Sequence, residues 1–312
     1  MVDEHLFSGK RILITGSSGF IGSQLTRRLT NLGGKIYAVS RVKQPKGGKV
    51  VQWLQGDLSD FDTVREVVRF TKPDLVFHLA SFVKGSRDLV NVMPTFRSNL
   101  MSQVYLMIAA AEEGCDRFIT TGSMEEPDPG DLIVLPNSPY SAAKWAASAY
   151  AKMFYALYQF PVVQLRIFMV YGPAQQDLSK LIPYVILSLL RGEAPKLSSG
   201  EREVDWIFVE DVIDGILAAA QTPEIEGKTV DIGSGRLQSI KSVVQQLVEH
   251  VNPQIKPLFG SLPDRPLELV RVADLDNTFG QIGWKPKTDL EEGLKLTITW
   301  YKNSLNKNGP VV

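Results

Sequence analysis

A tyrosine and a lysine stand four residues apart in the segment N-S-P-Y-S-A-A-K, which covers residues 137–144. Residues at positions i and i+4 of a helix share one face, so Tyr140 and Lys144 can reach the same small volume. The unperturbed pKa of a phenol is about 10, which is high for proton transfer at neutral pH, and a nearby ammonium favours the phenolate. The spacing therefore predicts a proton-transferring pair, with a solvated polar helix face as the alternative.

The elements that must position this pair follow an alternating pattern. Apolar runs that read as strands cover residues 11–15, 35–39, 50–55, 74–79, 117–121 and 162–168, and helical patterns separate them, including a long one that ends at 113. Such alternation indicates βαβ crossovers and a parallel sheet, and continuous rather than alternating apolar strands agree with a sheet covered on both faces. Beyond this region, helices are expected near 180–191, 211–221, 239–250 and 289–303, and short strands near 203–209 and 228–232.

The sequence thus predicts an α/β fold, a doubly wound parallel Rossmann sheet with a smaller C-terminal α/β substrate lobe. We expect residues 1–172 to form the dinucleotide-binding domain that carries the catalytic residues. Residues 173–303 would form the substrate lobe, with segments that return to the main sheet, and residues 304–312 a flexible tail.

Composition excludes several classes of function. The 312 residues hold 34 Lys and Arg against 34 Asp and Glu, so no charge excess argues for nucleic acid. Cys115 is the only cysteine, and three scattered histidines offer no ligand spacing, so neither a disulfide nor a metal site is expected. The N-terminus lacks a signal-peptide pattern and no run of about 18 apolar residues occurs, so we expect a soluble cytoplasmic protein without a membrane span.

A glycine-rich turn, T-G-S-S-G-F-I-G at residues 15–22, connects the first strand directly to a helix. In this context Gly16 permits the tight turn, Gly19 lets the backbone approach a pyrophosphate, and Gly22 lets the helix pack on the sheet. The helix N-terminus offers free N–H groups to phosphates. We therefore assign dinucleotide binding to this turn, with contacts from Gly16, Ser18, Gly19, Phe20, Ile21 and Gly22.

The G-x-x-G-x-x-G spacing together with Y-x-x-x-K resembles the extended, nucleotide-sugar branch of the short-chain dehydrogenase/reductase superfamily. The resemblance covers nearly the whole chain. It includes G-D-L at 56–58, H-L-A at 78–80, L-R-I-F-M-V-Y-G-P at 165–173 and D-W-I-F-V-E-D-V at 205–212, and also the C-terminal motif R-P…A-D…I-G-W-K-P at 265–286. It implies that Asp57 and Leu58 frame an adenine, and that Leu79, Ala80, Ser81 and Asn99 lie near the cofactor.

The second strand ends in Ser40-Arg41, with Lys43 close behind. An acidic residue there would bind a ribose 2′-hydroxyl and repel a 2′-phosphate, whereas a guanidinium can make bidentate contacts with phosphate. We therefore expect NADP(H) rather than NAD, with a solvated arginine as the alternative.

The resemblance also implies roles for T-T-G-S-M-E-E at 120–126. Ser123 would hydrogen-bond a carbonyl, and Tyr140 would be the general acid in reduction and the base in oxidation. Lys144 would also hold the nicotinamide ribose. Glu125 matches a dehydratase base or a buried orienting group, but Met124 replaces an acidic donor, and a thioether cannot donate a proton.

The pattern of this branch is broken at other positions. Residues 127–130 read P-D-P-G in place of Tyr-Gly, Met169 replaces an Asn, and Val204 replaces an Arg. Because a bidentate phosphate donor is lost, Arg202, Arg265 or Arg271 could substitute for it. We expect substrate contacts from Lys84, Ser123, Met124, Met169, Arg202 and Arg265, and Lys84 reads equally well as a solvated loop residue.

The resemblance favours NADPH-dependent reduction of the 4-keto group of a nucleoside-diphosphate 4-keto-6-deoxyhexose, as in reductases of the paratose and abequose synthase type. A nucleotide-sugar 4-epimerase or 4,6-dehydratase would use the same residues. A non-catalytic, dinucleotide-sensing regulator is a further alternative, but such proteins typically lack the Tyr or Lys. Helical segments 87–113 and 140–158 resemble those that pair in homodimers, with packing on the sheet as the alternative.

Overall fold

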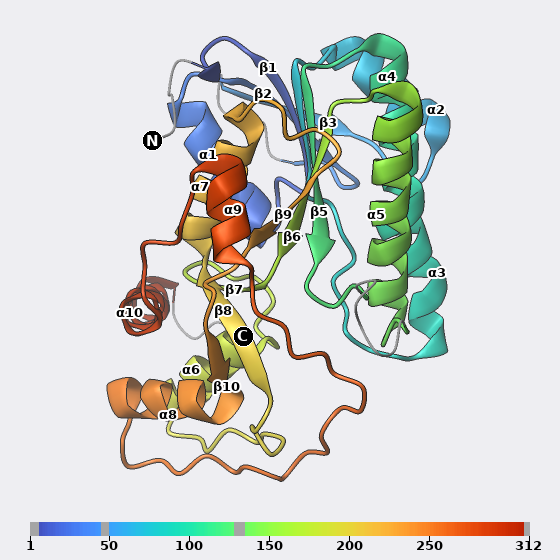
Figure 1. Ribbon diagram of the computed structural model, residues 1–312. Coiled ribbons are helices and arrows are strands. Elements are labelled where there is room, and N and C mark those ends of the chain that lie inside the picture. The colour runs from blue at the N-terminus through green and yellow to red at the C-terminus, as the bar shows by residue number, and fades with distance from the viewer. Residues whose placement is uncertain (1–5, 45–49, 128–134, 309–312) are drawn as a thin grey trace. The chain divides into compact units, whose positions relative to one another are not determined.

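The computed structural model describes residues 6–44, 50–127 and 135–308 (Figure 1). Two compact units are present. The first comprises Met1–Ile167, Ile213–Asp231 and Asn277–Trp284, and the second comprises Phe168–Val212, Ile232–Asp276 and Lys285–Val312. Two segments from the C-terminal half of the chain therefore belong to the first unit. The domain limits at 172 and 303 stay a prediction.

A seven-stranded sheet organises the first unit, with strand order β3-β2-β1-β4-β5-β6-β9. The pairs from β3 through β6 are parallel. This order is that of a doubly wound dinucleotide-binding fold, in which ligands bind at the carboxyl ends of the strands where the order reverses, here between β1 and β4. The bounds are β1 Arg11–Thr15, β2 Lys35–Ser40, β3 Val51–Gln55, β4 Leu75–His78, β5 Arg117–Ser123, β6 Val162–Ile167 and β9 Thr229–Ile232.

Helices cover both faces of this sheet (Figure 1). On one face lie α2 (Phe61–Thr71), α4 (Ser102–Glu113) and α5 (Pro139–Tyr158), and on the other lie α1 (Phe20–Asn31), α7 (Val209–Gln221) and α9 (Leu275–Ile282). Strands buried on two sides are continuously apolar, and Ile12, Leu13 and Ile14 of β1 are all fully buried.

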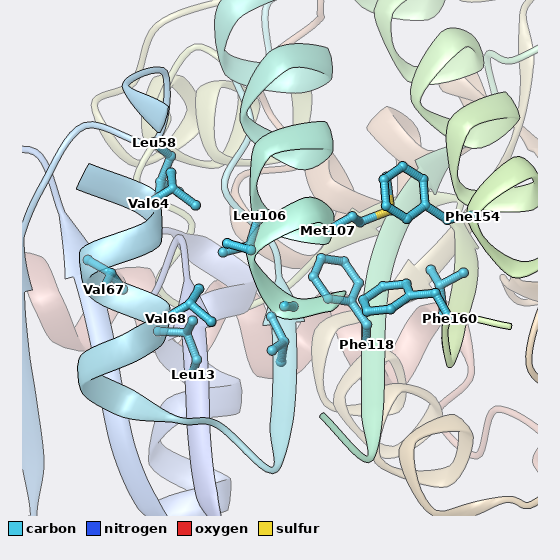
Figure 2. Packing of buried hydrophobic residues seen from close by; sticks show 14 of the residues in the cluster. Leu13, Leu58, Val64, Val67, Val68, Leu106, Met107, Phe118, Phe154 and Phe160 are labelled. Atoms are coloured by element: carbon cyan, nitrogen blue, oxygen red, sulfur yellow. The ribbon is translucent and has the colours of Figure 1, made fainter. Parts of the chain in front are cut away.

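A hydrophobic cluster joins α2, α4 and α5 to the strands below them (Figure 2). Val64 and Val68 project from α2 and Met107 from α4, and Phe118 of β5 packs against Phe160 with ring centroids 5.4 Å apart. At about 25 cal/mol per Å² of apolar surface removed from water, such burial is the main force that holds these helices on the sheet.

The helical stretch that ends at residue 113 is not one helix. It consists of a 3-10 segment η2 (Leu89–Asn91), a short helix α3 (Val92–Thr95), a π-helical segment η3 (Phe96–Met101), and then α4. Pro94 cannot donate a backbone hydrogen bond, and a π segment accommodates a locally widened helix. The π segment carries Asn99, whose side chain is buried.

The second unit is built around a three-stranded sheet of order β10-β8-β7. Strands β7 (Met169–Tyr171) and β8 (Glu203–Phe208) are parallel, and β10 (Leu237–Ser239) is antiparallel to β8. Three helices supply apolar side chains to one cluster on this sheet: α6 (Leu181–Leu190), α8 (Ile240–Val251) and α10 (Leu290–Asn308).

The ends of several elements differ from expectation. Strands β7 and β10 and helix α9 are too short to give a clear periodic signal, and the sequence does not predict them. Helix α10 continues through Asn308, so residues 304–308 are helical rather than a flexible tail, and Leu305 packs against the second cluster. Across the residues that the structure describes, no helix has both the length and the apolar character that crossing a membrane requires.

Candidate active site

The tyrosine and lysine lie in the first two turns of α5. Ser138 caps this helix by accepting a hydrogen bond from the Ser141 N–H at 3.1 Å, and Pro139 occupies the first helical position, where its missing N–H costs nothing. The cap and the proline fix where the helix begins. The four-residue spacing then places Tyr140 and Lys144 on one face.

Lys144 is buried, and its Nζ donates to the backbone oxygen of Thr121 at 2.7 Å and to the Thr121 hydroxyl at 3.2 Å. Burial lowers the pKa of this lysine to about 8, while the negative charge of Glu126 opposes the effect. An ammonium has three donors, and Thr121 takes two of them. One N–H is therefore available for a ligand hydroxyl.

Tyr140 hydrogen-bonds with two serine hydroxyls, those of Ser123 and Ser81. Its pKa is raised above that of a free phenol, first because burial disfavours the phenolate and then because Glu125 lies close. The sequence prediction that Lys144 favours the phenolate is therefore not the dominant effect here. The desolvated surroundings keep the phenol protonated.

Ser123 ends β5 and is buried, and its hydroxyl accepts a hydrogen bond from the Glu125 N–H at 3.2 Å. The Glu125 backbone oxygen accepts from the Ser141 hydroxyl at 2.7 Å, which joins this turn to α5. Met124 is buried, so a thioether and not a proton donor occupies the position between them. Residues 128–130 of the adjoining P-D-P-G segment lie outside the described residues.

Sequence reasoning missed Glu126 as a site residue. Its side chain is only 5% exposed, and its Oε1 accepts a hydrogen bond from the Ser123 N–H at 2.6 Å. Two adjacent glutamates in S-M-E-E gave no sign of which would be buried. The packing of β5 against α5 decides this.

The glycine turn has the close approaches that its role requires. Gly16 has φ of +75°, and a Cβ there would lie 2.7 Å from the Ala80 N. A Cβ on Gly22 would lie 2.0 Å from the Gly16 oxygen. Gly19 is the N-cap residue of α1 and has no side chain that could accept a hydrogen bond. The first backbone N–H groups of the helix therefore have no side-chain cap. The turn therefore offers the backbone donors that a pyrophosphate needs.

The other residues of this turn are more accessible. Ser18 is exposed, and Phe20 and Ile21 are half-buried at the start of α1. At the end of β2, Arg41 and Lys43 are exposed, and no acidic residue lies between them. This edge therefore carries positive charge at the position where an adenosine ribose is expected.

Two residues after β3 have different environments. Asp57 is exposed, and its carboxylate accepts a hydrogen bond from the Ser59 N–H at 2.9 Å. The Leu58 side chain lies in the hydrophobic cluster (Figure 2), so only its backbone remains for a ligand.

The loop after β4 is held by Asn99. The Asn99 Oδ1 accepts from the Ser81 hydroxyl at 3.1 Å and from the Phe82 N–H at 2.6 Å, and its Nδ2 donates to the Phe82 oxygen at 3.2 Å. Leu79 and Ala80 form the backbone that faces Gly16. Lys84 is exposed, with its Nζ 5.8 Å from the centre of the Phe82 ring. The structure thus joins the glycine turn to Tyr140 through residues 79–81.

Three residues expected near a substrate belong to the second unit. Met169 begins β7, and Arg265 is exposed. Arg202 pairs with Glu268 at 2.9 Å and donates to the Leu269 oxygen at 3.1 Å. Val204 is fully packed in the apolar cluster of this unit. The substrate roles of Met169, Arg202 and Arg265 stay predictions.

These residues can do acid–base chemistry beside a dinucleotide. A neutral phenol is hydrogen-bonded to a serine at the carboxyl end of β5, and a lysine with one available donor lies one turn along α5. The narrow glycine cradle and the uncapped start of α1 fit a dinucleotide pyrophosphate. Within the described part of the chain, no cluster of three His, Cys, Asp or Glu side chains could hold a metal ion.

Comparisons with known proteins agree with this geometry. Residues 12–233 match the family described as NAD dependent epimerase/dehydratase family. The chain is 27% identical to a dTDP-D-glucose 4,6-dehydratase of Mus musculus over 95% of this chain and 90% of that protein. It is 28% identical to a UDP-glucose 4-epimerase of Mycolicibacterium smegmatis over 94% of this chain and 99% of that protein.

Solved structures give the same result. The UDP-glucose 4-epimerase of Thermotoga maritima, solved with UDP-glucose, superposes with a TM-score of 0.85 at 26% identity, covering 94% of this chain and 99% of that one. MoeE5, solved with UDP-glucose and NAD, superposes with a TM-score of 0.83 at 29% identity, with the same coverage.

Proposed function

Because this chain belongs to the NAD dependent epimerase/dehydratase family, we propose that it uses Tyr140 to transfer a proton to or from a sugar oxygen of a nucleoside-diphosphate sugar. In the direction that we favour, it reduces the 4-keto group of a 4-keto-6-deoxyhexose with NADPH. The observation that carries the proposal is the hydrogen bond between the Tyr140 and Ser123 hydroxyls at the carboxyl end of β5, with Lys144 one turn along α5. The reductive direction rests on the basic residues after β2, which favour NADPH.

The residues have separate tasks in this reaction. The Ser123 and Tyr140 hydroxyls hydrogen-bond each other in the protein without substrate, and each turns its O–H to the carbonyl oxygen when substrate binds. Tyr140 then gives its proton to that oxygen as the carbonyl carbon is reduced. Lys144 holds the ribose hydroxyl beside the tyrosine with its remaining N–H. A bound nicotinamide dinucleotide supplies the hydride.

The choice of NADPH rests on the end of β2. Arg41 and Lys43 are exposed there, and a guanidinium binds a 2′-phosphate through two charge-assisted hydrogen bonds. Two of the solved structures with a similar fold, MoeE5 and the Bordetella bronchiseptica enzyme WbmF, were solved with NAD and with NADH. The cofactor preference is therefore the part of the proposal that a direct assay tests first.

The similar proteins suggest two other reactions, because they include a UDP-glucose 4-epimerase and dTDP-D-glucose 4,6-dehydratases. Both reactions need the same serine, tyrosine and lysine. Dehydration also needs an acid at the leaving hydroxyl, and buried Met124 offers none, whereas Glu125 could serve as its base. Epimerisation is thus the stronger second candidate.

The experiment follows NADPH absorbance at 340 nm while CDP-, dTDP-, GDP- and UDP-linked 4-keto-6-deoxyhexoses are added in turn. We expect rapid loss of absorbance with one of them, no loss in Y140F, and slower loss with NADH. The same enzyme is then incubated with UDP-glucose and dTDP-glucose, and the products are separated. Epimer formation without net NADPH consumption would replace the reductase by the epimerase.

We also propose that the chain forms a homodimer through α3, η3 and α5. Large apolar side chains are exposed on these elements, among them Met93 at 53%, Phe96 at 42% and Trp145 at 39%. A surface of this kind marks a protein interface. Light scattering on W145E should give one chain per particle if the dimer uses this face, and an unchanged dimer would exclude it.

A further inference from the structure

One buried carboxyl beside the catalytic residues has no role in the proposed reaction. Glu126 lies three residues after Ser123 and accepts hydrogen bonds on both of its oxygens. Oε1 accepts from the Ser123 N–H at 2.6 Å, and Oε2 accepts from the Ser148 hydroxyl at 2.5 Å and from the Gln164 Nε2 at 3.4 Å. The carboxyl therefore joins the end of β5 to both α5 and β6.

The surrounding backbone makes room for this carboxyl. A Cβ on Gly122 would lie 2.5 Å from the Glu126 Oε1 and 2.7 Å from the Gln164 Nε2. No side chain could therefore stand at 122 while Glu126 keeps its position. The Ser148 hydroxyl is also 2.9 Å from the Lys144 backbone oxygen, so the contact reaches the turn of α5 that carries the lysine.

The hydrogen bonds fit the ionised form of Glu126. A backbone N–H and an amide NH₂ can only donate, and a carboxylate can only accept. Ser123 and Gln164 thus present donors to it. A protonated carboxyl would donate to the Ser148 hydroxyl, which would then donate to the Lys144 backbone oxygen. Burial raises the pKa of Glu126, whereas the hydrogen bonds from Ser148 and Ser123 and the charge of Lys144 lower it and favour the ionised form.

The charged and titratable groups around Glu126 come from three elements. Lys144 and Tyr140 approach from α5, and Arg166 approaches from β6 and pairs with Asp231 of β9 at 2.7 Å. Lys144 is 2% exposed, and among the residues that the structure describes the negative charge of Glu126 opposes the effect of this burial on the lysine pKa. A buried ammonium is costly unless an opposite charge compensates it.

We propose that Glu126 is a positioning residue of the active site, which fixes the Ser123 backbone and supplies the counter-charge that keeps Lys144 an ammonium. The role of Glu126 in catalysis rests on the proposed function. Its effect on the charge of Lys144 does not depend on which reaction the protein performs. Glu126 acts through Ser123 and Lys144 and does not touch the substrate itself.

The test uses the full chain without cofactor or substrate. Lysine labelled with ¹³C at Cε is followed by NMR from pH 6 to 11, and the Lys144 resonance is assigned by its absence in K144M. In E126Q the Gln oxygen can still accept the Ser123 N–H, while the Gln NH₂ replaces the oxygen that accepted from Ser148 and Gln164, so the charge and these two hydrogen bonds are removed. We expect the Lys144 titration midpoint to fall from about 8 by about 1 pH unit or more.

Two variants make the result specific. E126D keeps the charge and should return the midpoint to within about 0.5 of the wild-type value, even if a shorter side chain weakens the hold on Ser123. E112Q removes an exposed carboxylate that pairs with Arg65, and should leave the midpoint unchanged. An unchanged midpoint in E126Q, or an equal fall in E126D, would overturn the proposal. If E126Q does not fold, E126D alone decides the test. A fall of its Lys144 midpoint by about 1 pH unit or more would then overturn the proposal.

A second readout concerns catalysis. Removing the negative charge lowers the pKa of Lys144 and of Tyr140 together, because Glu126 raises both. The alkaline loss of kcat/KM in the reduction should therefore move to lower pH in E126Q, with a fall in kcat and little change in KM for the cofactor. A purely structural role would lower kcat without moving the alkaline limb. If the wild type reduces none of the sugars, the proposed function fails while the NMR result still decides the role of Glu126.

Discussion

The Asn99 side chain accepts a hydrogen bond from the Phe82 backbone N–H at 2.6 Å, which connects a π-helical segment to the loop that follows β4. The same side chain accepts from Ser81, and Ser81 in turn hydrogen-bonds with Tyr140. Asn99 was expected to lie near the cofactor. In the structure its direct role is to hold the loop that contacts the Tyr140 hydroxyl.

Replacing Asn99 by Leu should destabilise the protein. The change keeps a similar volume but leaves the Phe82 N–H and oxygen without their partners, and each unsatisfied buried group costs about 1–3 kcal/mol. Urea unfolding should show a lower midpoint. S81A is the control: it removes only a hydroxyl, so it should unfold close to the wild type while losing activity. Equal stability of N99L and wild type would show that Asn99 does not hold the loop after β4.

Replacing Gly22 by Ala should abolish dinucleotide binding. The new Cβ would lie 2.0 Å from the Gly16 oxygen, so the turn must open and its N–H groups must turn away from a pyrophosphate. Fluorescence titration with NADPH measures the loss. G280A is the matched control, because a Cβ there meets nothing within 4 Å, and it should bind NADPH normally. Normal binding by G22A would show that this turn is not the cofactor site.

Replacing Lys144 by Met should change how stability depends on pH. Burial lowers the folded-state pKa of Lys144 to about 8 from 10.5. The unfolded chain binds more protons between these values, so the lysine's cost of about 3 kcal/mol is fully present below pH 8 and disappears as pH rises toward 10.5. Urea unfolding of both proteins at pH 7, 8, 9 and 10 gives the difference in free energy of unfolding. The wild type should become more stable relative to K144M as pH rises. A difference that is constant over this range would mean that Lys144 titrates normally.

Replacing Arg41 by Asp should reverse the cofactor preference. A charge-assisted hydrogen bond contributes about 1.5–3 kcal/mol, so its loss should weaken NADPH binding by about 10- to 100-fold and leave NADH binding nearly unchanged. Dissociation constants for both cofactors measure this. Lys35 is exposed at the opposite end of the same strand, and K35D makes a similar change in charge, so it should affect neither cofactor. Equal loss of both cofactors in R41D would remove the basis for NADP(H).

The fold could be read from the sequence where the periodicity was strong. Strands β1 to β6 and helices α1, α2 and α5 follow from apolar runs and from cap residues, because burial on two faces and helix caps act within a few positions. Short elements such as β7 and α9 owe their existence to packing against distant segments, which no local pattern records.

The sequence predicts which residue types form the candidate site but not their electrostatics. The structure places Tyr140, Ser123 and the glycine turn in one unit, and their catalytic and binding roles stay predictions. The raised pKa of Tyr140 depends on desolvation and on Glu125, and the burial of Glu126 depends on the space that Gly122 leaves. Both effects are set by atoms that come together only in the folded chain.

The π segment has a consequence for the length of the chain. A π segment holds one more residue than the α-helical winding that it replaces, so a one-residue deletion between Phe96 and Met101 would restore regular winding while α4 keeps its orientation. Leu106 and Met107 of α4 would then stay in the core, but Asn99 would lose the position from which it holds the loop after β4. The extra residue therefore serves the loop that contacts Tyr140 and not the packing of α4.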